Sequence, residues 1–132
     1  IVHTSYTRAI DSPTVQLNIA DARQAIDGAR FFMYRAADTL DDSILEGREL
    51  SILERARARA DIGSAAKLVR DASELLLNVA GPSGFQKSSP IQRYWRCLQL
   101  GSRHGYINYD ITREAYAKAL LGLDVSTVTD AL

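Results

Sequence analysis

Ser89-Pro90-Ile91-Gln92-Arg93-Tyr94-Trp95-Arg96, followed by Gly101-Ser102-Arg103-His104-Gly105, is the stretch from which the architecture of this chain can be worked out. Serine directly before proline predicts the start of a helix. The hydroxyl can cap free backbone N–H groups, and proline at the first helical position lacks an N–H that would be unpaired anyway. From Pro90 the helical pattern continues to about His104.

Arginine, tryptophan and histidine side chains share this predicted helix. Arg93 and His104 are eleven residues apart, which is about three helical turns, so they are expected to project from nearly the same face. The same helix must bury Trp95 and Leu98. This combination predicts a polar site beside a core.

Three further helices are predicted from apolar residues that recur at alternating spacings of three and four. The first begins at Ser12-Pro13, continues to about Leu40 and is broken by Asp41-Asp42-Ser43; the second covers about 49–79 and stops at Gly81-Pro82; the last covers about 108–121. No segment alternates with period two. Short connections between four helices predict an all-α fold, an antiparallel four-helix bundle with two long and two shorter helices.

Length and composition restrict the functional classes. A chain of 132 residues is expected to form a single domain over residues 1–132. Sixteen basic and sixteen acidic residues cancel, so no overall charge favours nucleic acid or an anionic membrane. The single cysteine fits a reducing cytoplasm. No apolar run is long enough to span a membrane, and two histidines and one cysteine give no metal-ligand spacing.

Aromatic residues surround the first predicted helix. Phe31, Phe32 and Tyr34 occupy more of its circumference than one apolar seam can bury. They fit two interpretations, a broad core face or a contact with another subunit or domain.

Residues 88–108, SSPIQRYWRCLQLGSRHGYIN, and residues 118–132, KALLGLDVSTVTDAL, resemble the C-terminal domain of flavin-dependent monooxygenases of the acyl-CoA dehydrogenase fold. Ser12-Pro13-Thr14-Val15-Gln16, followed by Ala20-Asp21-Ala22, fits the opening of the same domain. The resemblance covers nearly the whole chain. Together with the first residue, Ile1, it leads us to expect the C-terminal fragment of a longer flavoenzyme, with little activity by itself.

The resemblance implies a two-component reaction. Reduced FMN or FAD, delivered by a separate flavin reductase, would react with oxygen to give a C4a-hydroperoxide, which transfers oxygen to a phenolic or amine substrate. It also implies a homotetramer, a dimer of dimers. No nucleic acid and no membrane would take part.

The same resemblance implies a catalytic role for His104, because hydroxylases of this family have a histidine near the flavin ring in this segment. A histidine titrates near neutrality, so it can orient or deprotonate a substrate group. A structural alternative is a helix-terminal histidine bonded to backbone carbonyls. Some relatives carry a further histidine where this chain has Gly101.

Gly81-Pro82-Ser83-Gly84-Phe85 is, by composition alone, an ordinary turn. The resemblance implies more, because the matching loop in the family reaches the flavin of a neighbouring subunit. Gly81, Ser83 and Gly84 would then be cofactor contacts, with Phe85 packing nearby. Arg8 matches a flavin-contacting arginine of the family.

Gln86 favours oxygenation over dehydrogenation. Gln86 stands where many acyl-CoA dehydrogenases have their catalytic glutamate, and a neutral amide cannot remove the proton beside a thioester. Arg93 and Arg96 would ordinarily form surface salt bridges, whereas the resemblance implies ion pairs inside the bundle or at a subunit contact. Cys97 replaces the aspartate of the family pattern and is expected to be buried. The alternatives are an acyl-CoA dehydrogenase domain and a non-catalytic oligomerisation or interaction module.

Overall fold

A computed structural model describes residues 4–132, and all regular structure in this range is helical. Two long helices, α1 and α2, have 33 and 29 residues, and two short helices, α3 and α4, have 12 each. The elements are η1 (Ala9–Asp11), α1 (Pro13–Leu45), α2 (Ile52–Ala80), η2 (Gly81–Phe85), α3 (Pro90–Gly101) and α4 (Tyr109–Leu120). The prediction of an all-α fold with two long and two shorter helices is confirmed.

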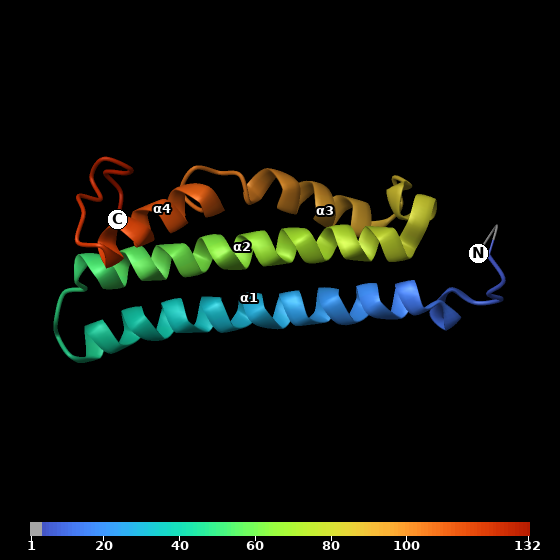
Figure 1. Ribbon diagram of the computed structural model, residues 1–132, viewed down its shortest axis with the longest axis horizontal. Coiled ribbons are helices and arrows are strands. Elements are labelled where there is room, and N and C mark those ends of the chain that lie inside the picture. Colours follow the sequence, from blue (N-terminus) through green and yellow to red (C-terminus); the bar gives the residue numbers. More distant parts are fainter. Residues whose placement is uncertain (1–3) are drawn as a thin grey trace.

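Helix α2 lies in the middle of the molecule (Figure 1). The antiparallel helix α1 packs along one side of it, while α3 and α4 follow each other along the other side. All three contact α2, whereas α1 makes no extended contact with α3 or α4. The other three helices are therefore joined to one another through α2, and α1 does not close the bundle against α3 and α4.

The helix starts show which sequence signals were used. Pro13 and Pro90 occupy the first turns of α1 and α3, as predicted. The preceding serines are correctly placed, but neither side chain bonds a backbone N–H, so the capping part of the prediction is wrong. Side-chain caps occur instead at α2, where Ser51 and Glu54 form a reciprocal capping box, and at α4, where Asn108 accepts two N–H bonds.

Two predicted helix ends are wrong. Helix α1 passes through Asp41-Asp42-Ser43 and ends at Leu45, because both aspartates face solvent and the Ser43 hydroxyl donates to the Leu40 carbonyl at 2.8 Å. Helix α3 ends at Gly101, so His104 lies in the following turn and shares no helix face with Arg93.

Small residues form the core of the described chain. Nine of the eleven buried hydrophobic residues are alanines, and the other two are Leu77 and Val125. Large apolar side chains stay at the surface: Phe31 is 76% exposed and Tyr34 58%, while Phe32 is half-buried. The broad-core interpretation of this aromatic cluster is therefore wrong for Phe31 and Tyr34.

Two contacts fix α2 against its neighbours. Gly63 lies against the fully buried Thr112 of α4, so closely that an added Cβ would come 2.1 Å from Oγ1 of Thr112. On the other side, Arg35 of α1 donates two hydrogen bonds, at 2.8 and 2.5 Å, to the buried carboxylate of Asp61. Small residues let helices approach closely, and the part of α2 around Asp61 and Gly63 is therefore tightly packed against α1 and α4.

Candidate functional site

The loop after α2 has a defined shape. Gly81 adopts a φ of +62°, which favours glycine, and starts the short helix η2. Gly84 is buried, and an added Cβ would lie 2.8 Å from Cβ of Ala80. The Ser83 hydroxyl donates to the Ala80 carbonyl at 2.8 Å, so it must rotate before it can donate to a phosphate. Both glycines are thus required by the fold of the loop itself.

Phe85 connects this loop to α3. Its ring packs edge-on against Trp95, with 6.0 Å between the ring centroids, and remains 55% exposed. Trp95 in turn donates from Nε1 to Oε1 of Glu74 on α2 at 2.7 Å. The loop is thereby fixed to the first half of α3.

Arg8 directly precedes η1, and this N-terminal segment lies at the same end of the molecule as the loop (Figure 1). Its guanidinium forms two hydrogen bonds with Asp11, at 3.0 and 2.7 Å, and the hydrogen-bonded guanidinium holds the pKa of Asp11 below its ordinary value. Both groups are exposed. A flavin contact would have to compete with this ion pair.

His104 is exposed in the turn between α3 and α4. Its Nδ1 accepts a hydrogen bond from the backbone N–H of Tyr106 at 3.3 Å. In the neutral ring the proton then belongs on Nε2, which leaves Nε2–H available as a donor. No carbonyl cap binds the ring among the described contacts, so the helix-terminal alternative is not the one observed.

The predicted residues form two separate groups. The loop 81–85 and the segment that leads into η1 lie near one end of the molecule, whereas the turn between α3 and α4, which contains His104, lies about halfway along it (Figure 1). The 12 residues of α3 separate them, a distance of about 18 Å at the usual helical rise. One copy of this chain does not bring them together.

The surface beside His104 has open space at two glycines. Gly101 and Gly105 have no atom within 4 Å of an added Cβ, apart from their own immediate chain neighbours. Gly101 ends α3, and Gly105 lies in the turn that follows this helix. A flat ring supplied from outside the chain has room to approach here.

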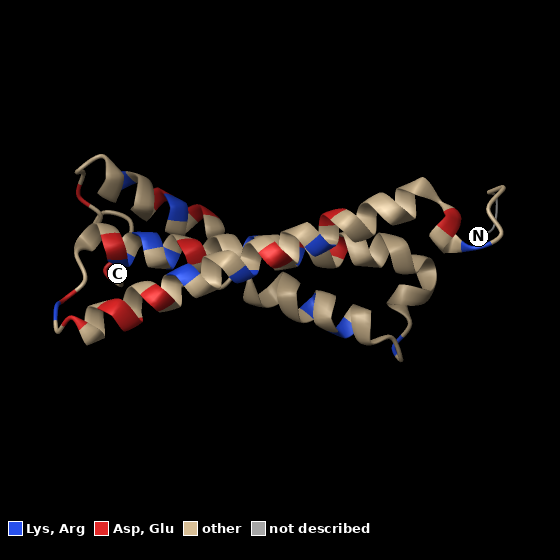
Figure 2. Ribbon diagram, turned by 90° about the horizontal axis from the view of Figure 1, so that it is seen from below, with Lys and Arg blue, Asp and Glu red and all other residues tan. Residues whose placement is uncertain are grey.

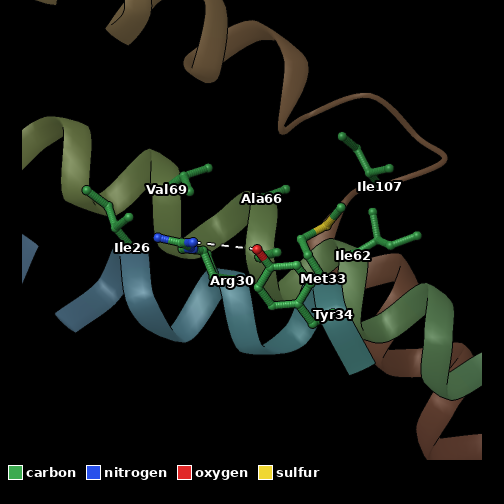
Figure 3. Close-up of a pocket in the computed structure, with 10 residues that line it drawn as sticks. Ile26, Arg30, Met33, Tyr34, Ile62, Ala66, Val69 and Ile107 are labelled. Atoms are coloured by element: carbon green, nitrogen blue, oxygen red, sulfur yellow. Dashed lines mark hydrogen bonds between the residues drawn. The ribbon is translucent and has the colours of Figure 1, made fainter. Parts of the chain in front are cut away.

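Two apolar grooves were not predicted from the sequence. One, of 430 Å³, lies between α1 and α2 near Ile107, with Met33 and Ile62 in its lining (Figure 3). At its rim, Arg30 donates to the Tyr34 hydroxyl at 3.5 Å. The second, of 400 Å³, lies between α2 and α3. Of the aromatic residues singled out on α1, only Tyr34 lines the first groove, and His104 lines neither.

A cationic cleft runs along the exposed face of α3, with Lys87, Arg93, Arg96 and Cys97 in its lining. The helix carries basic but no acidic residues (Figure 2). Neither arginine forms an ion pair within residues 4–132, so the expected pairing inside the bundle is wrong. Cys97 is exposed, and the expectation of a buried cysteine is also wrong.

Neither a membrane-spanning helix nor a metal-binding cluster occurs in the described part of the chain. No helix between residues 4 and 132 is long and apolar enough to cross a membrane. Over the same residues, no three His, Cys, Asp or Glu side chains gather where they could hold a metal ion.

Comparisons with known proteins point to flavoenzymes. Over 121 residues the chain is 31% identical to an FADH(2)-dependent resorcinol hydroxylase, oxygenase component, from Rhizobium sp. (strain MTP-10005), covering 89% of the chain and 30% of that protein. It is 28% identical over 128 residues to a pigment production hydroxylase from Rhodococcus sp. (strain ATCC 21145), covering 92% and 31%. The chain thus spans about a third of the length of these curated relatives.

Solved structures agree with the sequence relatives. XiaF from Streptomyces sp., in complex with FADH2 and glycerol, matches all of this chain and 33% of its own, with a TM-score of 0.93 and 35% identity. A 3-HSA hydroxylase from Rhodococcus sp. RHA1 matches 93% of this chain and 32% of its own, with a TM-score of 0.76 and 25% identity. The family model described as acyl-CoA dehydrogenase, C-terminal domain, matches residues 2–109. The chain therefore belongs to the acyl-CoA dehydrogenase C-terminal domain family.

Proposed function

We propose that this domain is part of the oxygenase component of a two-component hydroxylase, which uses reduced FAD to hydroxylate a phenolic substrate. The observation that carries the proposal is the match of the whole chain, at a TM-score of 0.93, to a protein in complex with FADH2. The 31% identity to an FADH(2)-dependent resorcinol hydroxylase favours FAD over FMN and a phenol over an amine.

The residues around His104 suit a flavin ring. Gly101 and Gly105 leave open space beside the turn, and His104 presents Nε2–H to that space while Nδ1 is held by Tyr106. When bound, the flavin supplies the activation of dioxygen and the transfer of one oxygen atom. His104 donates from Nε2 to the oxygen of the phenolic substrate and so orients it. This tautomer supports the orienting role over proton removal, because Nδ1 is already occupied.

The loop 81–85 would serve a different flavin from the one beside His104. Since α3 places about 18 Å between the two groups, a single ring cannot touch both. We assign Gly81, Ser83 and Gly84 to the phosphate part of a neighbouring subunit's flavin, with Phe85 supporting the loop and Arg8 at the same end. This arrangement requires an oligomer, for which a homotetramer remains our prediction.

Further partners follow from the proposed reaction. A separate flavin reductase must deliver the reduced cofactor, since the most informative relative is described as an oxygenase component. The exposed thiol of Cys97 fits a reducing compartment such as the cytoplasm. The two apolar grooves, one between α1 and α2 and one between α2 and α3, would be covered in the assembled enzyme.

The test uses the full-length protein without oxygen at first. Binding of FADH2 and FMNH2 is titrated separately, then oxygenated buffer and resorcinol are added and hydroxylated product and hydrogen peroxide are quantified. We expect tighter binding of FADH2, product formation with wild type, and product yield reduced about tenfold or more in His104→Asn with more peroxide. Reduction of bound FAD by an acyl-CoA would identify a dehydrogenase instead. Absence of flavin binding would leave a structural module.

A further inference from the structure

Arg59 is a buried arginine near the start of α2, where it is only 8% exposed. A buried cation is costly unless it is paired or fully hydrogen-bonded. No carboxylate within residues 4–132 forms an ion pair with it. Its partners are instead neutral oxygens and an aromatic ring, so these contacts must offset the cost of burying the charge.

The partners of Arg59 come from two distant parts of the chain. Nε donates to the Tyr106 carbonyl at 3.1 Å, and Nη1 donates to Oγ1 of Thr129 at 2.9 Å and to the Ala131 carbonyl. The guanidinium also lies 4.6 Å from the centre of the Tyr106 ring. One planar group thus joins the turn between α3 and α4 to the segment that follows α4.

Tyr106 is the residue that sets the orientation of His104. Its backbone N–H donates to Nδ1 of His104, while its carbonyl and its ring are both held by Arg59. Within the turn, His104 N–H donates to the Gly101 carbonyl and Ile107 N–H donates to the His104 carbonyl, both at 3.0 Å. Arg59 adds the contacts that connect Tyr106, which is 54% exposed, to α2. Fixing the backbone of Tyr106 therefore fixes which imidazole nitrogen faces outward.

We propose that Arg59 is a positioning residue for His104, acting through Tyr106, and that docking of residues 129–131 onto Arg59 completes this arrangement. The inference rests on the proposed function, because it concerns the same imidazole. It adds a residue on another helix that touches neither substrate nor flavin. It also makes the segment after α4 a determinant of how productively the reduced flavin is used.

The main test is a double-mutant cycle in the full-length protein, with Arg59→Met, His104→Asn and the double variant. Product formed per reduced flavin consumed is measured, together with KM for the phenol. We expect Arg59→Met to lower the yield about tenfold and to leave flavin binding unchanged. In the His104→Asn background the same change should have no further effect, because residues that act as one unit are not additive.

A second measurement does not depend on activity. Diethyl pyrocarbonate modifies unprotonated imidazole nitrogens, and the rate at His104 is followed by peptide mass spectrometry in flavin-free protein. Loss of the Tyr106 N–H bond frees Nδ1, so the rate should rise severalfold in Arg59→Met and less in Thr129→Val. Arg23→Met, which removes an exposed guanidinium from α1, a helix without extended contact to α3 or α4, should leave the rate unchanged.

The outcomes separate this inference from the proposed function. If His104→Asn keeps the wild-type yield, the role of His104 fails and Arg59 is judged by the modification rates alone. If Arg59→Met lowers the yield equally in both backgrounds and leaves modification of His104 unchanged, the positioning role is wrong. Should Arg59→Met not fold, Arg59→Lys and Thr129→Val replace it, and effects of intermediate size in the same direction are expected.

Discussion

Helices α3 and α4 have the same length, 12 residues, and both pack on α2, yet they are packed very differently. Helix α4 buries Thr112 and Ala115, and its start is capped by the side chain of Asn108. Helix α3 has no buried residue and no side-chain cap. Its outer face carries an unpaired cationic cleft, and a groove separates part of it from α2.

The difference divides the domain into a scaffold half and an interface half. The scaffold half is α4 with the part of α2 that holds Arg59, Asp61 and Gly63, where packing is tight. The interface half is α3 with the loop 81–85, where aromatic and basic side chains remain exposed. The candidate flavin contacts lie at the two ends of α3, in the half that the chain does not cover by itself.

The largest expected loss of folding stability comes from Gly63→Ala, which changes a tightly packed position in the scaffold half. The new Cβ would come 2.1 Å from Oγ1 of Thr112. Overpacking of this kind costs up to about 3 kcal/mol, and urea unfolding of the full-length protein would measure it. Gly101→Ala on α3 is the matched control, because nothing lies within 4 Å of its added Cβ. Equal destabilisation by both changes would remove the contrast between the halves.

Asp61→Asn is expected to have the next largest effect. The side chain of Asp61 is 4% exposed and accepts both hydrogen bonds from Arg35, so loss of its charge should cost about 2 kcal/mol. Glu74→Gln is the control where α2 meets the interface half, because its exposed carboxylate accepts from Trp95 and Gln99 of α3 at 2.7 and 2.6 Å. The amide keeps an acceptor oxygen, so its unfolding midpoint should change little. A larger loss at Glu74 would contradict the division.

The two helix starts provide a smaller test. Asn108 accepts N–H bonds from Asp110 and Ile111, at 2.9 and 3.4 Å, so Asn108→Ala should lower stability by about 1 kcal/mol. Ser89 makes no such bond, and Ser89→Ala should be nearly neutral. Thermal unfolding of the two variants side by side decides the matter. The reverse order would mean that Ser89, not Asn108, provides the effective cap.

The smallest effect is a pH dependence at the start of α2, the helix that both halves share. Hydrogen bonds from the Ser51 backbone, the Arg48 guanidinium and the Ser51 hydroxyl lower the pKa of Glu54 from 4.5 to about 2. The charged form is favoured in the fold, so its stabilising contribution is complete above pH 4.5 and is lost as the pH falls towards about 2. Glu54→Gln should therefore differ from wild type above that range and converge with it below. A difference independent of pH would show that the capping box does not depend on the charge.

Much of the fold could be predicted from the sequence. Apolar spacing located all four helices, and the Ser-Pro pairs at Pro13 and Pro90 marked two starts within one residue. The helix ends were harder to predict, because they depend on how the polar side chains near each end are accommodated. The aspartates before Leu45 are tolerated in α1 since they face water, and α3 stops at Gly101 although apolar and polar residues continue the pattern.

The site was predictable only in part. Motifs singled out His104 and the loop 81–85, but no spacing rule indicates that His104 leaves the helix or that α3 separates it from the loop. Arg59 was not found, because its partners lie 47, 70 and 72 residues away in sequence. In the sequence, an arginine in an alanine-rich segment looks like an ordinary surface residue. Only the fold brings its three oxygen partners next to it.

Hydrogen–deuterium exchange of the full-length protein, with and without FADH2 under anaerobic conditions, tests the central claim most directly. Binding of reduced flavin by the interface half predicts slower exchange in peptides covering 81–85 and 101–107, with little change across α4 at 109–120. Unchanged exchange in both of those peptides while FADH2 is bound, or protection confined to α4, would contradict the claim.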